Sequence, residues 1–88
     1  MQDAVEKKPA AITRFEKEAL AAFDTGSFML EHPIERLKYH IETSGGKVID
    51  SQFEPDGTAM VVWLWEGVRY RAWSTWPGVE YKVNWKKT

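Results

Sequence analysis

One stretch of the chain decides its fold: TAMVVWLWEGVRYRAWSTWPGVEYKVNWK, residues 58–86, which contains all five tryptophans. Apolar and polar residues alternate along its last part, from Val79 to Lys86, as they do in a β-strand with one buried side. Two glycine-containing pairs, Glu66-Gly67 and Pro77-Gly78, divide the stretch into three segments and are typical of tight turns. The stretch therefore predicts three antiparallel strands joined by two turns.

The predicted turns determine which residues lie opposite each other. A two-residue turn at Glu66-Gly67 places Trp65 opposite Val68, and a turn at Pro77-Gly78 places Trp76 opposite Val79. Counting outward from both turns gives one apolar side of the sheet, which we call face A. Its predicted members are Ala59, Val61, Trp63, Trp65, Val68, Tyr70, Ala72, Ser74, Trp76, Val79, Tyr81, Val83 and Trp85. A shift of one residue would move each apolar set to the other side.

A third turn, Glu54-Pro55-Asp56-Gly57-Thr58, precedes this stretch. Its composition predicts a three-residue loop with a left-handed glycine, so that Glu54 pairs with Thr58 and Gly57 has a positive φ. This register places Ile49 and Phe53 on face A. Val48, Asp50 and Gln52 then lie on the opposite side, and a two-residue loop would instead bury polar residues.

Two amphipathic helices are predicted before the first strand, beginning at Pro9 and Pro33. Their apolar positions recur every three or four residues: Ile12, Phe15, Ala19, Ala22 and Phe23, then Ile34, Leu37 and Ile41. Gly45 or Gly46 is the expected left-handed cap of the second helix. We expect an α+β fold in which both N-terminal helices pack on face A of a four-stranded antiparallel meander, in the order 1-2-3-4. Residues 1–8 are expected to form a flexible tail, and residues 9–88 one domain.

Composition limits the classes of function. The net charge is −1, but residues 69–88 carry five Lys or Arg against Glu80 alone, so the basic excess lies on the last hairpin. The chain has no cysteine and no apolar run of membrane-spanning length. We expect a cytoplasmic protein without cofactors or membrane contact. Such composition is typical of small bacterial or phage accessory proteins.

Two short motifs resemble known functional signatures. Phe23-Asp24-Thr25-Gly26-Ser27 resembles the active-site signature of aspartic proteases, in which the Asp follows an apolar strand. Here a helical pattern precedes it, so we interpret Asp24 as part of a helix end. Ser44-Gly45-Gly46-Lys47 resembles a phosphate-binding loop, but it leads from a helix into a strand, where the helix dipole is unfavourable to anions, and we interpret it as a capping turn.

The titratable residues give no metal-site or catalytic pattern. His32 and His40 lack a partner at metal-ligand spacing. His32 is expected to help cap the second helix, and His40 to lie half-buried near the sheet. Asp50, Glu54 and Asp56 do not match a calcium-binding loop. No catalytic or metal-binding residue is therefore predicted.

The side of the sheet opposite face A, which we call face B, is the candidate functional surface. Its predicted members are Val48, Asp50, Gln52, Met60, Val62, Leu64, Arg69, Arg71, Trp73, Thr75, Glu80, Lys82, Asn84 and Lys86. An apolar ridge beside basic residues is unusual on a solvated sheet. Either a partner contacts it, or residues 28–30 or the N-terminal tail cover it.

Three functional hypotheses follow for face B. We favour a small non-enzymatic accessory protein that uses this face for protein–protein contacts or for homodimerisation. The first alternative is single-stranded nucleic-acid binding, with Trp73 stacking on bases, and the second is an enzyme of unknown type. The residues expected to bind the partner are Met60, Val62, Leu64, Arg69, Arg71, Trp73, Lys82 and Lys86.

Overall fold

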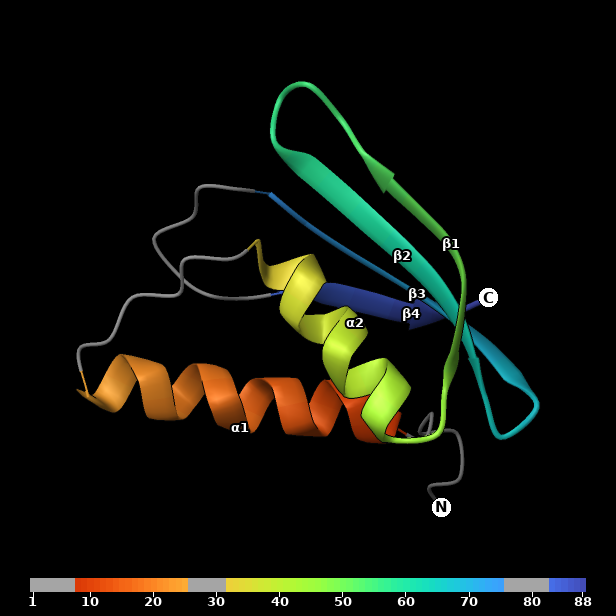
Figure 1. Ribbon diagram of the computed structural model, residues 1–88, viewed down its shortest axis with the longest axis horizontal. Helices are drawn as coiled ribbons and strands as arrows, with labels where there is room; N and C mark the ends of the chain where they lie inside the picture. The colour runs from red at the N-terminus through yellow and green to blue at the C-terminus, as the bar shows by residue number, and fades with distance from the viewer. Residues whose placement is uncertain (1–7, 26–31, 76–82) are drawn as a thin grey trace, which may run out of the picture.

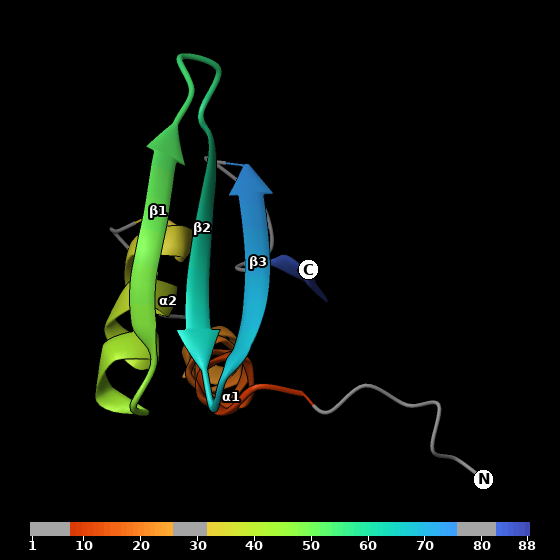
Figure 2. The same cartoon turned by 90° about the vertical axis from the view of Figure 1, so that its right-hand side faces the viewer.

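The computed structural model describes residues 8–25, 32–75 and 83–88. The described elements are α1 (Ala10–Thr25), α2 (Pro33–Thr43), β1 (Lys47–Phe53), β2 (Thr58–Trp65), β3 (Val68–Thr75) and β4 (Asn84–Lys87). The strands form one antiparallel sheet in the order β1-β2-β3-β4. Both helices lie on the same side of the sheet: in Figure 2, α2 lies behind β1, and α1, seen end-on, lies behind the β2–β3 hairpin. The predicted α+β architecture is confirmed (Figure 1).

The central β2–β3 hairpin has the predicted register along its whole length. Trp65 lies opposite Val68, and Met60 lies opposite Trp73. In the turn, Glu66 and Gly67 have φ angles of 53° and 78°. Positive φ at both central residues is the requirement of a type I′ turn, whose twist matches that of the flanking strands. The conformation of this turn thus determines which residues of β2 and β3 lie on face A and which lie on face B.

The turn between β1 and β2 also has the predicted conformation. Gly57 has a φ of 93°, and its N–H donates to the carbonyl oxygen of Glu54 at 3.0 Å. The N–H of Glu54 in turn donates to the carbonyl oxygen of Thr58 at 2.7 Å. Asp56 Oδ1 accepts a hydrogen bond from the backbone N–H of Thr58 at 2.9 Å, and this bond lowers the pKa of the Asp56 carboxyl. Pairing therefore begins as predicted, with Phe53 opposite Ala59.

A β-bulge in β1 makes the prediction for Val48 and Ile49 wrong. Asp50 lies opposite Val62, as predicted, but Val48 lies opposite Trp63, so Ile49 is an extra residue. A bulge interrupts the alternation of sides. Val48 consequently packs against the core instead of lying on face B, and Ile49 is 44% exposed instead of buried.

Phe53 lies at the outer end of β1, where the helices give it little cover, and it is 52% exposed. Its ring meets the His32 ring edge-on, with centroids 5.5 Å apart, and Lys38 Nζ lies 5.9 Å from its centroid. Phe53 is therefore on the helix-bearing side of the sheet, as its pairing with Ala59 requires, but it is a rim residue and not part of the core.

The last strand, β4, is displaced by two residues from the predicted register. The predicted turn places Ala72 opposite Val83, whereas Ala72 lies opposite Trp85. Because side chains alternate with a period of two, this displacement leaves the described residues of β4 on their predicted sides. Val83 and Trp85 pack against the core, as expected for face A. Trp76, the Pro77-Gly78 turn and residues 79–82 lie outside the described residues.

The core lies between face A and the two helices. Its fully buried side chains come from both layers, and the largest are Trp63, Phe15, Ile12, Ile34, Leu37, Ile41 and Val61. These are the inner positions of the predicted helical stripes and of the predicted face A. Alternation and helical periodicity together therefore identified most of the core.

The second helix has the predicted caps at both ends. His32 is its N-cap, and the ring Nδ1 accepts a hydrogen bond from the N–H of Ile34 at 3.1 Å. At the other end, Gly45 has a φ of 91°, and the N–H of Gly46 donates to the carbonyl oxygen of Ile41 at 2.8 Å. This is the hydrogen bond of a Schellman motif, which ends the helix and directs the chain into β1.

Candidate protein-binding face

Face B is the side of the sheet turned away from α1 and α2, and neither described helix covers it (Figure 2). Met60, Val62 and Trp73 are half-buried, and Leu64 is 38% exposed. On a sheet without a covering layer, such burial comes from neighbouring side chains on the same surface. Within the described residues, an apolar ridge on β2 is thus accessible from solvent.

The strand pairing arranges face B in rows that cross the sheet. One row runs Asp50, Val62, Arg71 and Lys86, and the next runs Gln52, Met60, Trp73 and Asn84. Each row begins with a polar or acidic residue on β1 and has an apolar residue on β2. In the first row the β3 and β4 positions hold the basic residues Arg71 and Lys86, and in the second row they hold Trp73 and Asn84. Face B therefore has an acidic and polar edge, an apolar centre and a basic edge.

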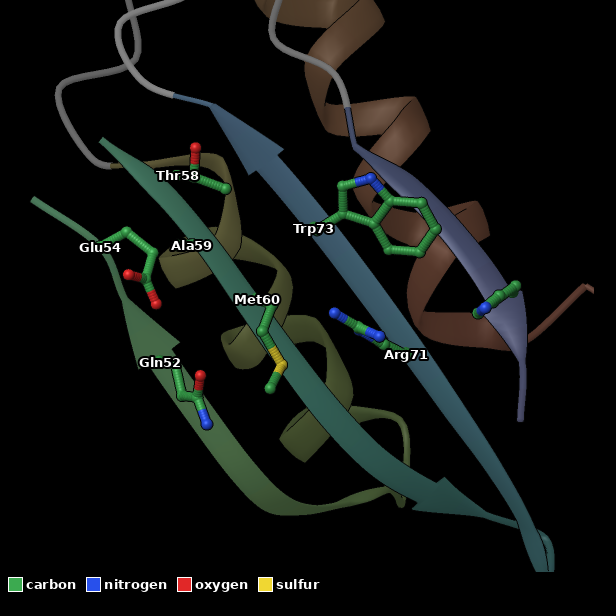
Figure 3. A pocket seen from close by; sticks show the side chains of 8 residues that line it. Gln52, Glu54, Thr58, Ala59, Met60, Arg71 and Trp73 are labelled. Atoms are coloured by element: carbon green, nitrogen blue, oxygen red, sulfur yellow. The ribbon is translucent and has the colours of Figure 1, made fainter. Parts of the chain in front are cut away.

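A hollow of about 280 Å³ lies on this face. Figure 3 shows Met60 between two groups of side chains: Gln52 on β1 and Glu54 just after it on one side, and Arg71 and Trp73 on β3 on the other. The complete lining is Gln52, Glu54, Thr58, Ala59, Met60, Arg71, Trp73 and Lys86. An apolar floor with polar groups at its rim is typical of a surface that receives side chains of a partner.

Arg71 connects the apolar and basic parts of face B. Its guanidinium carbon lies 5.7 Å from the centroid of the Trp73 ring, within the range of a cation–π contact. Arg71 is also the direct cross-strand partner of Lys86. Like charges in that position are destabilising, and no ion pair to either cation occurs within residues 8–25, 32–75 and 83–88. An acidic group supplied by a partner would relieve this repulsion.

Seven of the eight predicted partner-binding residues lie together on face B: Met60, Val62, Leu64, Arg69, Arg71, Trp73 and Lys86. The eighth, Lys82, lies outside the described residues, as do residues 28–30 and residues 1–7 of the predicted tail, which are the segments proposed as a cover. Gln52 and Glu54 also line the hollow, although they were not among the predicted partner-binding residues. The predicted register places Gln52 on face B correctly. The alternation does not indicate, however, that its side chain lines a hollow beside Met60.

A polar cluster between the helices was not predicted. Glu18 on α1 accepts hydrogen bonds from Arg36 Nε at 2.8 Å and Arg36 Nη2 at 2.7 Å, and its Oε1 lies 2.8 Å from His40 Nε2. The hydrogen bonds from Arg36 hold the pKa of the Glu18 carboxyl below its ordinary value, against the opposing effect of burial, and His40 acts in the same direction as Arg36. His40 is only 9% exposed, more deeply buried than expected. These contacts of Glu18 with Arg36 and His40 connect α1 to α2.

The two motifs that resemble known signatures have the predicted backbone context. Helix α1 continues to Thr25, so Asp24 is preceded by a helix and not by the strand of an aspartic protease. Ser44 to Lys47 connect the end of α2 to β1. In the part of the chain that the structure describes, no group of three or more His, Cys, Asp or Glu could hold a metal ion. Of the two described helices, neither combines the length and apolarity needed to cross a membrane.

Comparisons with protein-family models, with curated proteins and with solved structures found no match for this chain. Functional inference for this protein depends on the chemistry of face B.

Proposed function

We propose that the protein is a non-enzymatic binding module that recognises another protein surface through face B. The observation that carries this proposal is the uncovered ridge of Met60, Val62 and Leu64 beside Trp73. Contiguous apolar surface of this kind on a sheet face is typical of interaction sites. Tryptophan and arginine are also the residue types that most often dominate binding energy, and β3 presents both.

Single-stranded nucleic-acid binding is the second candidate, because Arg71 lies over Trp73 and is paired with Lys86. A stacked base and a phosphate would fit these groups. Two observations favour protein recognition over this alternative. The acidic residues Asp50 and Glu54 lie on the same face, and the net charge of the chain is −1. Both oppose the approach of a polyanion.

The proposal is tested by truncating the aromatic anchor. The full-length protein is immobilised, bound proteins are recovered from a lysate of the source cells, and the affinity of the recovered partner is measured by calorimetry for the wild type and for Trp73→Ala. Truncation of a buried anchor should weaken binding by at least about 2 kcal/mol. The matched control is Thr75→Ala, the next face B position on β3, which is exposed and lies beyond the ridge.

The folded state of each variant is checked by near-ultraviolet circular dichroism before binding is compared. Equal affinity of the wild type and Trp73→Ala, with both folded, would contradict the proposal. Tight binding of a single-stranded oligonucleotide, lost in Arg71→Glu, would instead support the nucleic-acid alternative.

A further inference from the structure

Each row of face B is chemically complementary to a second copy of the same row that runs in the opposite direction across the sheet. In the row Asp50, Val62, Arg71 and Lys86, the two ends carry opposite charges. In the row Gln52, Met60, Trp73 and Asn84, both ends carry amides, and the two inner residues are a thioether and an indole. Reversing either row therefore places chemically matching groups opposite each other.

A two-fold axis performs this reversal if it lies parallel to the strands, between two sheets that face each other, and midway between β2 and β3. Such an axis places β1 over β4 of a second copy and β2 over β3 of that copy. Each row then meets its own reverse. The strands of the two sheets remain nearly aligned, which is the usual geometry when two twisted sheets pack face to face.

The contacts that result are favourable along both central rows. Asp50 faces Lys86 of the second copy, and Gln52 faces Asn84 of the second copy. Met60 faces Trp73 of the second copy, where sulfur–aromatic contact adds to apolar burial. Val62 lies against the aliphatic stem of Arg71 of the second copy. Because the axis is two-fold, each contact occurs twice.

A two-fold axis that crosses the strands gives a different result. It places β3 and β4 over the same strands of the second copy, so that Arg69, Arg71 and Lys86 all meet a basic surface. The acidic edge then lies over the other acidic edge. Charge complementarity therefore selects the axis parallel to the strands.

The size of face B suits an interface between two copies. Strands β2 and β3 have eight residues each, which corresponds to a length of about 26 Å. Strand β1 has seven residues and β4 has four, so four strands about 4.8 Å apart give a flat footprint of roughly 430 Å². Projecting side chains raise the accessible area toward the roughly 800 Å² that each partner buries in a standard interface.

We infer that the partner recognised by face B is a second copy of this chain, in a face-to-face dimer whose two-fold axis is parallel to the strands. This inference rests on the proposed function of face B and specifies its partner. The dimer would bury Met60, Val62 and Trp73 in a layer between two sheets, with the helices of both copies outside.

The inference is tested by exchanging charges at the two ends of one row. Sedimentation velocity over a range of protein concentrations gives the dimer dissociation constant of the full chain and of two variants, Asp50→Lys and Lys86→Asp. Each single change creates two like-charge contacts in a dimer of that variant, so self-association should weaken roughly tenfold or more. The matched controls are Glu42→Lys on the exposed side of α2 and Lys87→Asp on the other side of β4, and both should dimerise like the wild type.

Mixing the two single variants is the decisive step. A heterodimer of Asp50→Lys with Lys86→Asp contains two opposite-charge contacts, so the mixture should regain the affinity of the wild type. An axis across the strands brings position 50 near position 50 and position 86 near position 86 of the second copy, so like charges meet in the wild type and in both single variants. That axis predicts little weakening in either single variant and a mixture that associates more tightly than the wild type. Failure of the mixture to recover, with both variants folded, would overturn the inferred axis.

A wild-type protein that stays monomeric at its highest soluble concentration would overturn the inferred partner. That result would leave the proposed function intact if a different protein bound face B and lost affinity in Trp73→Ala. Dimerisation that is insensitive to both charge changes would indicate a different axis or a different interface and would overturn the inference as well.

Discussion

Trp63 on β2 and Tyr70 on β3 are cross-strand partners whose rings stack in the core, with centroids 5.5 Å apart and planes inclined by 26°. Trp63 has no exposed surface, and Tyr70 is 3% exposed. The Trp65 and Trp85 rings lie 6.3 Å and 6.2 Å from the Tyr70 ring, so aromatic side chains from three strands meet around it. This cluster joins the sheet to the residues buried beneath the helices.

The first prediction concerns the stability that Trp63 supplies. Trp63→Ala should lower the free energy of unfolding by about 3 to 5 kcal/mol, because it empties a fully buried site in a core that cannot collapse completely. Urea denaturation followed by far-ultraviolet circular dichroism measures the change. The control is Trp73→Ala on face B, where the side chain is only half-buried and the loss should be clearly smaller.

Trp63→Phe should be much milder than Trp63→Ala. In the described part of the chain, the buried Trp63 Nε1 has no hydrogen-bond partner, and an unsatisfied buried donor costs about 1 to 3 kcal/mol. Phenylalanine keeps an aromatic ring and removes this donor, which offsets part of the lost packing. A loss equal to that of Trp63→Ala would show that the indole N–H is satisfied in solution.

The second prediction concerns Gly46, between α2 and β1. A Cβ at this position would lie 2.9 Å from Ile41 Cγ2, 3.1 Å from the Ile41 carbonyl oxygen and 3.2 Å from the Leu64 carbonyl oxygen. Two of these neighbours are backbone atoms and cannot rotate away. Gly46→Ala should therefore destabilise the protein by about 1 to 3 kcal/mol, the range for overpacking.

Gly67→Asn is the matched control for Gly46→Ala. Gly67 has a φ of 78°, and an added Cβ there meets nothing within 4 Å. Asparagine tolerates the left-handed region, so this change should cost little. Thermal unfolding of both variants compares the two costs, and an unchanged melting temperature for Gly46→Ala would show that the end of α2 can move away from β2.

The third prediction follows from the lowered pKa of Glu18. A carboxyl whose pKa is lower in the folded state stabilises that state above its unfolded-state pKa of about 4.3, and loses this contribution as the pH falls through the folded-state value. Glu18→Gln should thus cost about 1 to 2 kcal/mol near neutral pH, since hydrogen bonds to charged groups are stronger than neutral ones. The difference from the wild type should shrink below about pH 4.

Chemical denaturation at a series of pH values measures this difference. Glu16→Gln on the same helix is the control, because Glu16 pairs with Lys8 at 2.7 Å but both side chains are nearly half exposed. Exposed ion pairs contribute about 0 to 1 kcal/mol. A Glu18→Gln effect that stays constant down to acidic pH would show that the carboxyl acts through packing and not through its charge.

The turns explain how far the sheet could be predicted from sequence. Glu66-Gly67 and Pro55-Asp56-Gly57 impose backbone angles that only one register satisfies, so the pairing of β2 with β3 and the start of β1 were predictable. The placement of Met60, Leu64 and Trp73 on face B followed from that register alone. Counting residues from the turns therefore predicts which residues lie together on face B.

The remaining errors arose where the sequence pattern fits two arrangements. Val48 and Ile49 are both apolar, so either could occupy the position opposite Trp63. The pattern of apolar and polar residues therefore does not predict the bulge that places Val48 there. The displacement of β4 is by two residues, which is invisible to a pattern with a period of two. The contact of Glu18 with Arg36 and His40 depends on how two helices are rotated against each other, which neither helix specifies alone.

The last prediction separates protein recognition from nucleic-acid recognition by the effect of salt on face B. For an interface with an apolar centre and charged ends, raising the salt from about 50 to about 200 mM should change the affinity only several-fold, because the end contacts are exposed and screened. Arg71→Glu should then weaken binding less than Trp73→Ala does.

Nucleic-acid binding predicts a steeper dependence. Phosphate contacts from Arg69, Arg71 and Lys86 would each release counterions, and three such contacts correspond to a loss of roughly 20-fold or more over the same salt range. Arg71→Glu would then reduce the slope of log affinity against log salt as well as the affinity itself. Sedimentation at several salt concentrations gives this slope if the protein dimerises, and calorimetry gives it for a heterologous partner or an oligonucleotide. A steep slope that becomes shallower in Arg71→Glu would contradict protein recognition, because an apolar ridge binding another protein has no comparable store of condensed counterions to release.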